Sequence, residues 1–295
     1  MPFSIILNSN NIVPNTSNSE FQYDFPNGGV IFKDDLIAVQ QISLYNSVFN
    51  ITASQNNDVF SYIWVDGTTN IVNMPNSYLD LAGINAYFQS VMFANKHYLT
   101  TAAGSIVYLM ELVVNAAQYA FQFNSYLISV AIAAANTWTI ASGASWVLPT
   151  NSILPMLIIP ATDIQTLLGF SAGSYPNTVI AGAPPAQTQT PTQTISYSVL
   201  STAAPQIIPT PTYLVACSLV QNKLAIPSQL IFSLTITGSS FGEIYVTQMS
   251  EPVFNPINNG QYQNFRIRFV DKNGNKVEFN DPNTMILLII KNKNE

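Results

Sequence analysis

Charge is almost absent from the middle of this chain, and this limits what the chain can fold into. From Leu112 to Asn222 the only charged residue is Asp163, although Asn, Gln, Ser and Thr are abundant there. A stretch of this length cannot be buried completely, so part of it must present an uncharged polar surface. Charged side chains normally keep a monomer soluble, and titratable groups normally carry out catalysis. The segment therefore favours contact with other protein over chemistry.

The composition of the whole chain agrees with this interpretation. Charged residues make up 8% of the 295 positions, whereas soluble domains usually contain about 25%. Hydrophobic residues reach 48%, which is ample for the cores of one large or two modest domains. The net charge is −6, and six of the nine basic residues follow Phe265, where they alternate with acidic ones. We expect no direct contact with nucleic acid, because that contact depends on clustered Lys and Arg.

Covalent and membrane features are few. Cys217 is the only cysteine, so an intrachain disulfide and a thiolate metal cluster are both excluded. The N-terminal residues lack the basic region of a signal peptide. The longest apolar stretch, Tyr126–Ala135, has ten residues, and a membrane helix needs about 20. We predict no membrane-spanning segment. The sequons at Asn15 and Asn50 carry no weight in so Asn-rich a chain.

Alternating apolar and polar residues predict strands on both sides of the middle segment. Three precede it, and five follow it with a hairpin turn at Asn273–Gly274: Phe21–Phe25, Leu36–Tyr45 and Val59–Val65, then Tyr213–Leu219, Leu230–Ile236, Glu243–Gln248, Phe265–Val270 and Met285–Ile290. Val277–Phe279 extends the hairpin. This pattern predicts a mainly β fold, a single eight-stranded jelly-roll sandwich, interrupted by an inserted second domain that contains one helix.

The predicted domains are an N-terminal arm at 1–19, the first part of the jelly roll at 20–70, an insertion domain at 71–209, and the second part of the jelly roll at 210–295. Helical spacing predicts one helix over Tyr78–Ala94, with Ser77 as its N-cap. Further along the insertion we expect strands at 106–114, 119–123 and 126–132, and one or two helical turns at 162–169 ended by glycine. Residues 184–211 are rich in Pro, Thr and Gln, and we expect an extended loop or strap there.

One motif resembles the nucleophile elbow of hydrolases. Gly169-Phe170-Ser171-Ala172-Gly173 matches G-x-S-x-G, but that elbow needs a strand before it, a helix after it and a later histidine. Here a helical turn precedes the motif, and the only histidine, His97, lies upstream. A loop with two glycines accounts for the same residues.

Other candidate sites also have simpler explanations. His97 lies near the predicted helix end, where we expect a capping or surface residue. Asp271–Asn275 with Glu278 faintly resembles a calcium loop, but a hairpin turn fits its spacing better. Neighbouring Asp34 and Asp35 would point to opposite faces of a strand and would not form an acid–base pair. Trp64, Trp138 and Trp146 could line a sugar-binding face, although a core or an interface is the expected place for them. No catalytic, cofactor-binding or metal-ligating residue is predicted, and no cofactor.

Four blocks follow one another along the chain: Met74–Tyr78, Asn151–Phe170, Tyr213–Leu219 and Phe265–Ile290. Taken in this order, they resemble the penton (minor capsid) proteins of virophages and of the related Polinton/Maverick elements. The most specific parts are Leu167-Leu168-Gly169-Phe170 and the terminal hairpin with its following strand. The strap at 184–211 departs from the family pattern.

The resemblance implies a non-enzymatic structural protein of the virion, assembled inside the host cell. It implies a single jelly-roll subunit that forms a homopentamer at the vertices of an icosahedral capsid, beside a major capsid protein with two jelly rolls. Some adenovirus pentons carry an Arg-Gly-Asp receptor motif, which is absent here, so a host receptor stays unknown. Phe3–Val13 is a candidate tether to neighbouring capsid proteins or to the inner membrane side.

Two alternatives remain at this stage. The first is a jelly-roll carbohydrate-binding or host-attachment module on a virion surface, which the aromatic content of the chain would suit. The second is a hydrolase built on Ser171. Oligomeric mass separates the penton from the attachment module, and Ser171→Ala tests the hydrolase.

Overall fold

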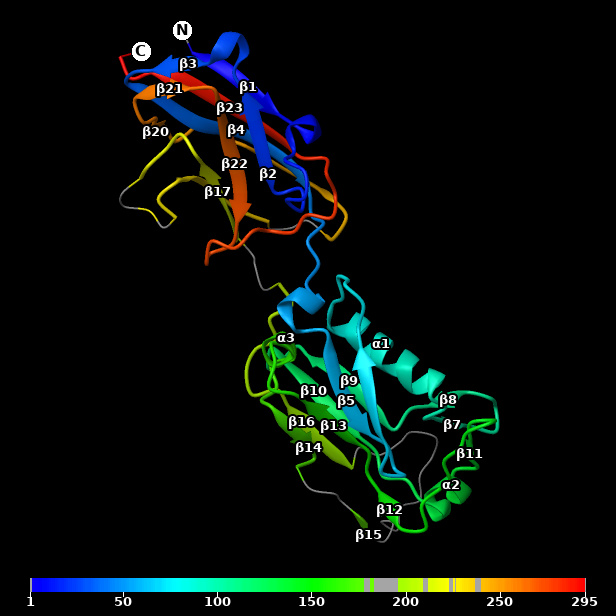
Figure 1. Cartoon of the computed structure of the whole chain (residues 1–295). Coiled ribbons are helices and arrows are strands. Elements are labelled where there is room, and N and C mark those ends of the chain that lie inside the picture. The colour runs from blue at the N-terminus through cyan, green and yellow to red at the C-terminus, as the bar shows by residue number, and fades with distance from the viewer. Residues whose placement is uncertain are drawn as a thin grey trace. The chain divides into compact units, whose positions relative to one another are not determined.

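The computed structural model describes residues 2–177, 181–182 (backbone only), 196–208, 212–222, 225, 227–236 and 240–294. The chain forms two compact units, each with its own hydrophobic core (Figure 1). Unit 1 contains residues 1–49 and 210–295, and unit 2 contains residues 50–209. Unit 2 is therefore inserted between two parts of unit 1.

Unit 1 is a sandwich of two antiparallel sheets. Sheet A has the order β1 (Phe3–Leu7), β23 (Met285–Asn292), β4 (Asp35–Tyr45) and β19 (Ile244–Gln248), and β20 (Asn255–Pro256) pairs with the start of β4. Sheet B has the order β18 (Leu230–Thr235), β17 (Thr212–Cys217), β22 (Asn264–Val270) and β2 (Glu20–Asp24). Alternate residues of both sheets, such as Leu288 on β23 and Phe269 on β22, enter one core.

The mainly β class and the two-sheet sandwich agree with the sequence-based prediction, but two strands lie elsewhere than expected. Phe3–Leu7, assigned above to an arm, is strand β1 and pairs with β23, so that Ile5 and Leu7 are buried. Val59–Val65, assigned above to the jelly roll, contains β5 (Val59–Ile63), which belongs to unit 2. The sequence pattern identifies Val59–Val65 as a strand but not the sheet that it joins, and it does not identify Phe3–Leu7 as a strand.

Turns of unit 1 use left-handed backbone where the sequence predicts it. Asn27 and Gly28, within the short helix η2 (Pro26–Gly28), and Gly29, between η2 and β3 (Val30–Phe32), all have positive φ. Strand β3 pairs with β21 (Gly260–Tyr262), and a Cβ at Gly29 would lie 2.6 Å from the Tyr262 carbonyl oxygen. Glycine is therefore required at position 29. The hairpin turn at Asn273–Gly274 also forms, with Gly274 at φ 85°.

Unit 2 contains two larger sheets and several short ribbons. One sheet has the order β14 (Gly173–Tyr175), β13 (Met156–Ile159), β5 and β6 (Thr69–Asn73), and the other has the order β16 (Tyr197–Leu200), β10 (Ala120–Ser125) and β9 (Met110–Asn115). The ribbons are β11 (Thr139–Ile140) with β7 (Leu99–Thr100) and β8 (Ile106–Val107), and β12 (Ser152–Ile153) with β15 (Ala181–Gly182). Short helices η1 (Ser9–Asn11) in unit 1 and η3 (Ala53–Gln55) in unit 2 complete the described elements.

Helix α1 (Leu81–Ala94) is the long helix that the sequence predicts, but it begins later than expected. Its N-cap is Asp80, whose Oδ1 accepts a hydrogen bond from Gly83 N at 2.7 Å. The prediction of Ser77 as N-cap is wrong, because Ser77 pairs with Ile51 in an isolated β-bridge. Ile84, Phe88 and Met92 form the buried face of the helix.

Two shorter helices accompany α1 in unit 2, where the sequence predicts one helix and one or two helical turns. Helix α3 (Ile164–Leu168) corresponds to the predicted turns and ends at Gly169, with φ 77°. Helix α2 (Val130–Ala135) lies where a strand at 126–132 was predicted. That prediction is wrong because Ser129 caps the helix: its Oγ accepts a hydrogen bond from Ile132 N at 3.3 Å. In the described residues, no helix is long and apolar enough to cross a membrane.

Asn50 closes unit 2 at the point where the chain enters and leaves it. Its side-chain amide donates to the carbonyl oxygens of Leu79 and Ile207, at 2.8 and 2.9 Å, and its Oδ1 accepts from Leu79 N at 3.0 Å. The side chain is buried, which leaves no room for a glycan at this sequon. Unit 2 thus begins at residue 50, and not at the predicted residue 71. Most of the predicted strap at 184–211 lies outside the described residues.

Candidate assembly surface

The outward side of sheet A carries a row of uncharged residues, which we call outer face A; Lys291, at the end of β23, is the charged residue that adjoins them on this side. Strand pairing places them side by side: Ser4 and Ile6 on β1, Met285, Leu287 and Ile289 on β23, Gln41, Ser43 and Tyr45 on β4, and Ile244, Val246 and Gln248 on β19. The most exposed apolar members lie on the two edge strands, with Ile6 at 55%, Ile244 at 54% and Val246 at 53%. An exposed apolar surface of this kind is typical of a protein contact.

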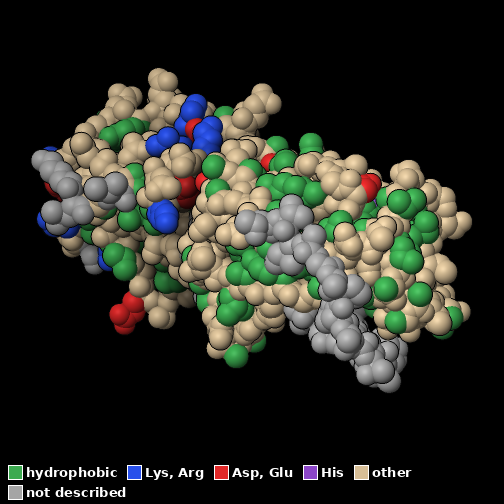
Figure 2. All heavy atoms as spheres, turned by 90° about the horizontal axis from the view of Figure 1, so that it is seen from below, with side chains coloured by type: hydrophobic (Ala, Val, Ile, Leu, Met, Phe, Trp, Pro, Cys, Tyr) green, Lys and Arg blue, Asp and Glu red, His purple; other side chains and the backbone are tan. Residues whose placement is uncertain are grey.

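The outward side of sheet B is charged instead. The Glu20 carboxylate contacts Arg266 Nη1 at 2.8 Å and Lys276 Nζ at 3.7 Å. Arg266 Nε also donates to Gln22 Oε1 at 3.1 Å, and Arg268 donates to Gln229. Figure 2 shows Lys and Arg gathered over one part of the visible surface, with uncharged side chains over most of the rest. The two sheets of unit 1 therefore present chemically different outer faces.

Unit 2 has very few charges on its surface. Its 160 residues include one basic side chain, Lys96, and five acidic ones. Three of the acidic side chains make local bonds: Asp80 caps α1, Asp66 Oδ1 accepts from Thr68 N at 2.9 Å, and Glu111 Oε1 accepts from Asn124 Nδ2 at 3.0 Å. Apart from these three, Lys96, Asp58 and Asp163, the side chains of unit 2 carry no charge, as the sequence indicates for most of residues 112–222.

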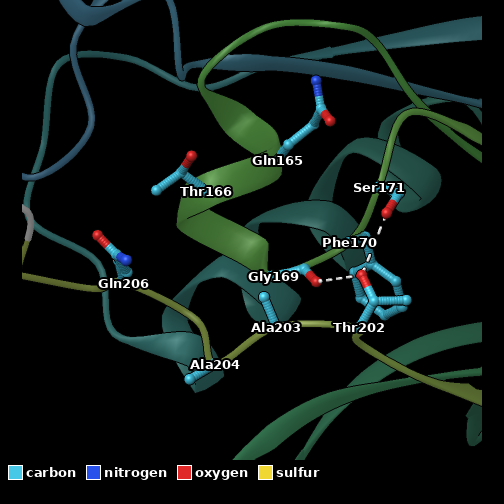
Figure 3. A pocket seen from close by; sticks show the side chains of 9 residues that line it. All are labelled: Gln165, Thr166, Gly169, Phe170, Ser171, Thr202, Ala203, Ala204 and Gln206. Atoms are coloured by element: carbon cyan, nitrogen blue, oxygen red, sulfur yellow. Dashed lines mark hydrogen bonds between the residues drawn. The ribbon is translucent and has the colours of Figure 1, made fainter.

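The surroundings of Ser171 differ from those of a catalytic serine. Gly169 is the C-cap of α3, and Gly173 begins β14, so a helix enters the motif and a strand leaves it. This order is the reverse of a nucleophile elbow. Ser171 Oγ is 3.1 Å from Thr202 Oγ1, and Thr202 Oγ1 donates to the Gly169 carbonyl oxygen at 3.3 Å (Figure 3).

A pocket of about 250 Å³ lies beside this loop, and its lining is uncharged. The residues drawn in Figure 3 are Gln165, Thr166, Gly169, Phe170, Ser171, Thr202, Ala203, Ala204 and Gln206. None of these side chains can serve as a general base or hold a positive charge at neutral pH. The lining can offer hydrogen bonds, but it contains no group that activates Ser171.

His97 is buried, which corrects the expectation of a capping or surface residue. Lys96 has a left-handed backbone, with φ 61°, and His97 N donates to the Met92 carbonyl oxygen at 2.8 Å. This turn directs the chain inward after α1. The imidazole stacks on Trp64 with centroids 4.6 Å apart, and its Nδ1 lies 2.8 Å from the Tyr62 hydroxyl. Burial lowers the pKa of His97 from 6.5 and raises the pKa of Tyr62 to about 12.

The lowered pKa of His97 predicts that unit 2 loses stability in mild acid. The unfolded chain binds a proton near pH 6.5, whereas the folded chain binds it only at lower pH. The contribution of neutral His97 to the free energy of unfolding is therefore fully present above pH 6.5. It decreases as the pH falls from 6.5 to the pKa of His97 in the folded chain. We expect urea unfolding, followed by tryptophan fluorescence, to show a lower free energy of unfolding at pH 5.5 than at pH 7.5. The dependence should be weaker in His97→Gln, and a higher stability of the wild type at pH 5.5 would contradict the prediction.

The acidic candidates have structural partners. Asp271 Oδ1 accepts hydrogen bonds from Asn273 N and Asn275 N, both at 2.8 Å, which stabilise the predicted hairpin turn. Asp34 has a left-handed backbone with φ 59°. The Asp35 carboxylate accepts a hydrogen bond from Lys33 N at 2.8 Å. Within the described part of the chain, no three His, Cys, Asp or Glu side chains are grouped as metal ligands would be.

All three tryptophans lie in unit 2 and are buried there, so they form core and not an exposed sugar-binding face. Trp64, Trp138 and Trp146 are 1%, 7% and 3% exposed. Trp146 Nε1 donates to the Lys96 carbonyl oxygen at 2.8 Å. The single cysteine, Cys217, is buried in unit 1, and burial raises the pKa of its thiol to about 12. Tryptophan fluorescence therefore reports on unit 2, and thiol reactivity reports on unit 1.

Comparison with known proteins finds similar solved structures, which include the following two. No family model and no curated protein sequence matches the chain. The mavirus penton protein is 9% identical over 98% of both chains, with a TM-score of 0.44. A chain of the Sputnik virophage is 10% identical over 100% of this chain and 98% of its own length, with a TM-score of 0.43. The assignment of unit 1 as a two-sheet sandwich follows from its own strand pairing.

Proposed function

We propose that this chain is a structural subunit of a viral capsid and forms its homopentameric vertex. The observation that carries the proposal is the scarcity of charge on outer face A and on unit 2, combined with a charged outer face on sheet B. A capsid subunit contacts other proteins on some faces and solvent on others. Uncharged faces suit the protein contacts, and charged faces suit the contact with solvent. Uncharged contacts avoid the cost of burying unpaired charges.

The viral setting is supported by the four sequence blocks that resemble virophage pentons. In unit 1 these blocks coincide with β17, β22 and β23, which are central strands of their sheets. In unit 2 they include the segment that leads into α1 and the segment from β12 to Phe170. The blocks therefore coincide with parts of both cores. Contact with a double jelly-roll major capsid protein and assembly inside the host cell belong to the same proposal.

Native mass spectrometry of the purified chain tests the proposal. We expect a species with five times the mass of one chain. Because the proposed contacts are uncharged, its abundance should change little between about 0.1 and 1 M salt, a range over which exposed ion pairs are strongly screened. A monomer at every concentration would contradict the proposal. A monomer or trimer that binds glycans would favour the attachment module instead.

A further inference from the structure

Sheet A has an open strand at each of its two ends. In the order β1, β23, β4, β19, the end strands β1 and β19 each pair with one neighbouring strand in the described part of the chain. Their other sides keep backbone N–H and C=O groups that a further strand could pair with. The two edges lie on opposite sides of the same sheet.

The backbone of β19 shows which residues face its open side. Alternate residues of an antiparallel strand bond to the same neighbour. Met249 N donates to the Gln40 carbonyl oxygen at 2.8 Å, so Tyr245 and Thr247 also direct their backbone groups toward β4. The other three residues of β19 therefore direct their backbone N–H and C=O groups away from β4, toward the open side. They are Ile244, Val246 and Gln248.

Within β1 and β19 themselves, the features that keep a monomer's sheet from pairing with another are absent; Pro256 lies in β20, which pairs with the other end of β4. Protected edge strands usually have Lys, Pro, an inward charge or a bulge. The sequences of the two strands are Phe-Ser-Ile-Ile-Leu for β1 and Ile-Tyr-Val-Thr-Gln for β19, without a charge or a proline. Their registers with β23 and β4 are continuous. Strands β1 and β19 thus lack the features that usually prevent an edge strand from pairing with a strand of another molecule.

Strand direction makes a second copy of this chain the fitting partner. Each neighbour along sheet A is antiparallel, so β1 and β19 run in opposite directions. If a second copy is placed beside the first in the same orientation, its β1 lies antiparallel to β19. We propose that β19 of one copy pairs with β1 of the next, which joins their A sheets into one. This inference rests on the proposed function and names its subunit contact.

The side chains at this junction are compatible with the pairing. Ile6 pairs with Leu287, Leu287 with Gln41, and Gln41 with Gln248, so Ile6 and Gln248 lie on the same face of the sheet. Val246 is two residues from Gln248 and shares that face. Pairing would bring exposed Ile6 of one copy near exposed Val246 of another. The contact uses two different surfaces, so it repeats from copy to copy and can close into a ring.

Charge substitutions at the two edges test the pairing. Val246→Lys and Ile6→Glu should each abolish the pentamer observed by native mass spectrometry, because each places one uncompensated charge in the junction. The double variant should restore the pentamer, since Lys and Glu then meet across it. The matched control is Val253→Lys, which changes a valine that is 73% exposed and lies outside both strands. It should keep the wild-type mass. Protection of the Cys217 thiol verifies that unit 1 remains folded.

The outcomes separate this inference from the proposed function. Pentamers of the wild type together with pentamers of folded Val246→Lys would overturn the strand pairing and leave the proposed function standing. Dimers of the wild type would also overturn it, because they would indicate like edges paired with each other. A wild type that is monomeric at every concentration would overturn both.

Discussion

Replacing Gly169 with alanine is expected to destabilise unit 2 strongly. The residue has φ 77°, and a Cβ built on it would lie 2.2 Å from the Ala203 carbonyl oxygen. Ala203 N donates to the Gly169 carbonyl oxygen at 3.0 Å, so the two backbones cannot separate without losing that bond. The left-handed conformation alone costs about 1–2 kcal/mol for alanine. With the clash added, we expect a loss of about 3 kcal/mol or more in the free energy of unfolding.

Gly143→Ala is the matched control for this prediction. Gly143 has a similar φ of 74°, but no heavy atom lies within 4 Å of its Cβ position. It should therefore lose only the conformational part, about 1–2 kcal/mol. Urea unfolding followed by tryptophan fluorescence measures both variants in unit 2. Equal losses in the two variants would show that the contact with Ala203 has no energetic effect.

Asn50→Ala is expected to open the junction where the chain enters and leaves unit 2. The substitution leaves Leu79 N–H and the carbonyl oxygens of Leu79 and Ile207 without their bonds to the Asn50 side chain. A buried polar group without a partner costs about 1–3 kcal/mol. Water can reach some of these groups once the side chain is removed, so we expect a total loss of about 2–4 kcal/mol in the stability of unit 2.

Asn73→Ala provides the comparison for Asn50. Asn73 lies on β6 in the same unit and is exposed, so its replacement should change the stability by less than about 0.5 kcal/mol. Tryptophan fluorescence reads out both variants, and Cys217 reactivity shows whether unit 1 is affected. If Asn50→Ala is as stable as Asn73→Ala, the bonds of Asn50 do not hold the two ends of unit 2 together.

Local pattern predicts most strands of unit 1 because one face of each is buried. Leu36–Tyr45, Glu243–Gln248, Phe265–Val270 and Met285–Ile290 are each found within a few residues of the observed strand. Helix α1 is recognised by its apolar spacing, and Gly169 by its place after a helical turn. These features depend on residues that are close in the sequence, so the local sequence pattern is sufficient to predict them.

Features that depend on distant neighbours could not be predicted in this way. The bond from Asn50 to Ile207 spans 157 residues, and no local pattern distinguishes it from a chance sequon. His97 is buried because the chain turns inward after α1 and meets Trp64 and Tyr62, which precede it by more than 30 residues. Outer face A likewise can be recognised as one surface only from the pairing of β1, β23, β4 and β19, which are distant in the sequence.

Images of the purified oligomer test most directly whether the uncharged surfaces are covered by further copies. Negative-stain electron microscopy should give class averages of rings with five-fold symmetry. Particles that are single copies at every concentration, with outer face A exposed to solvent, would contradict the proposed assembly.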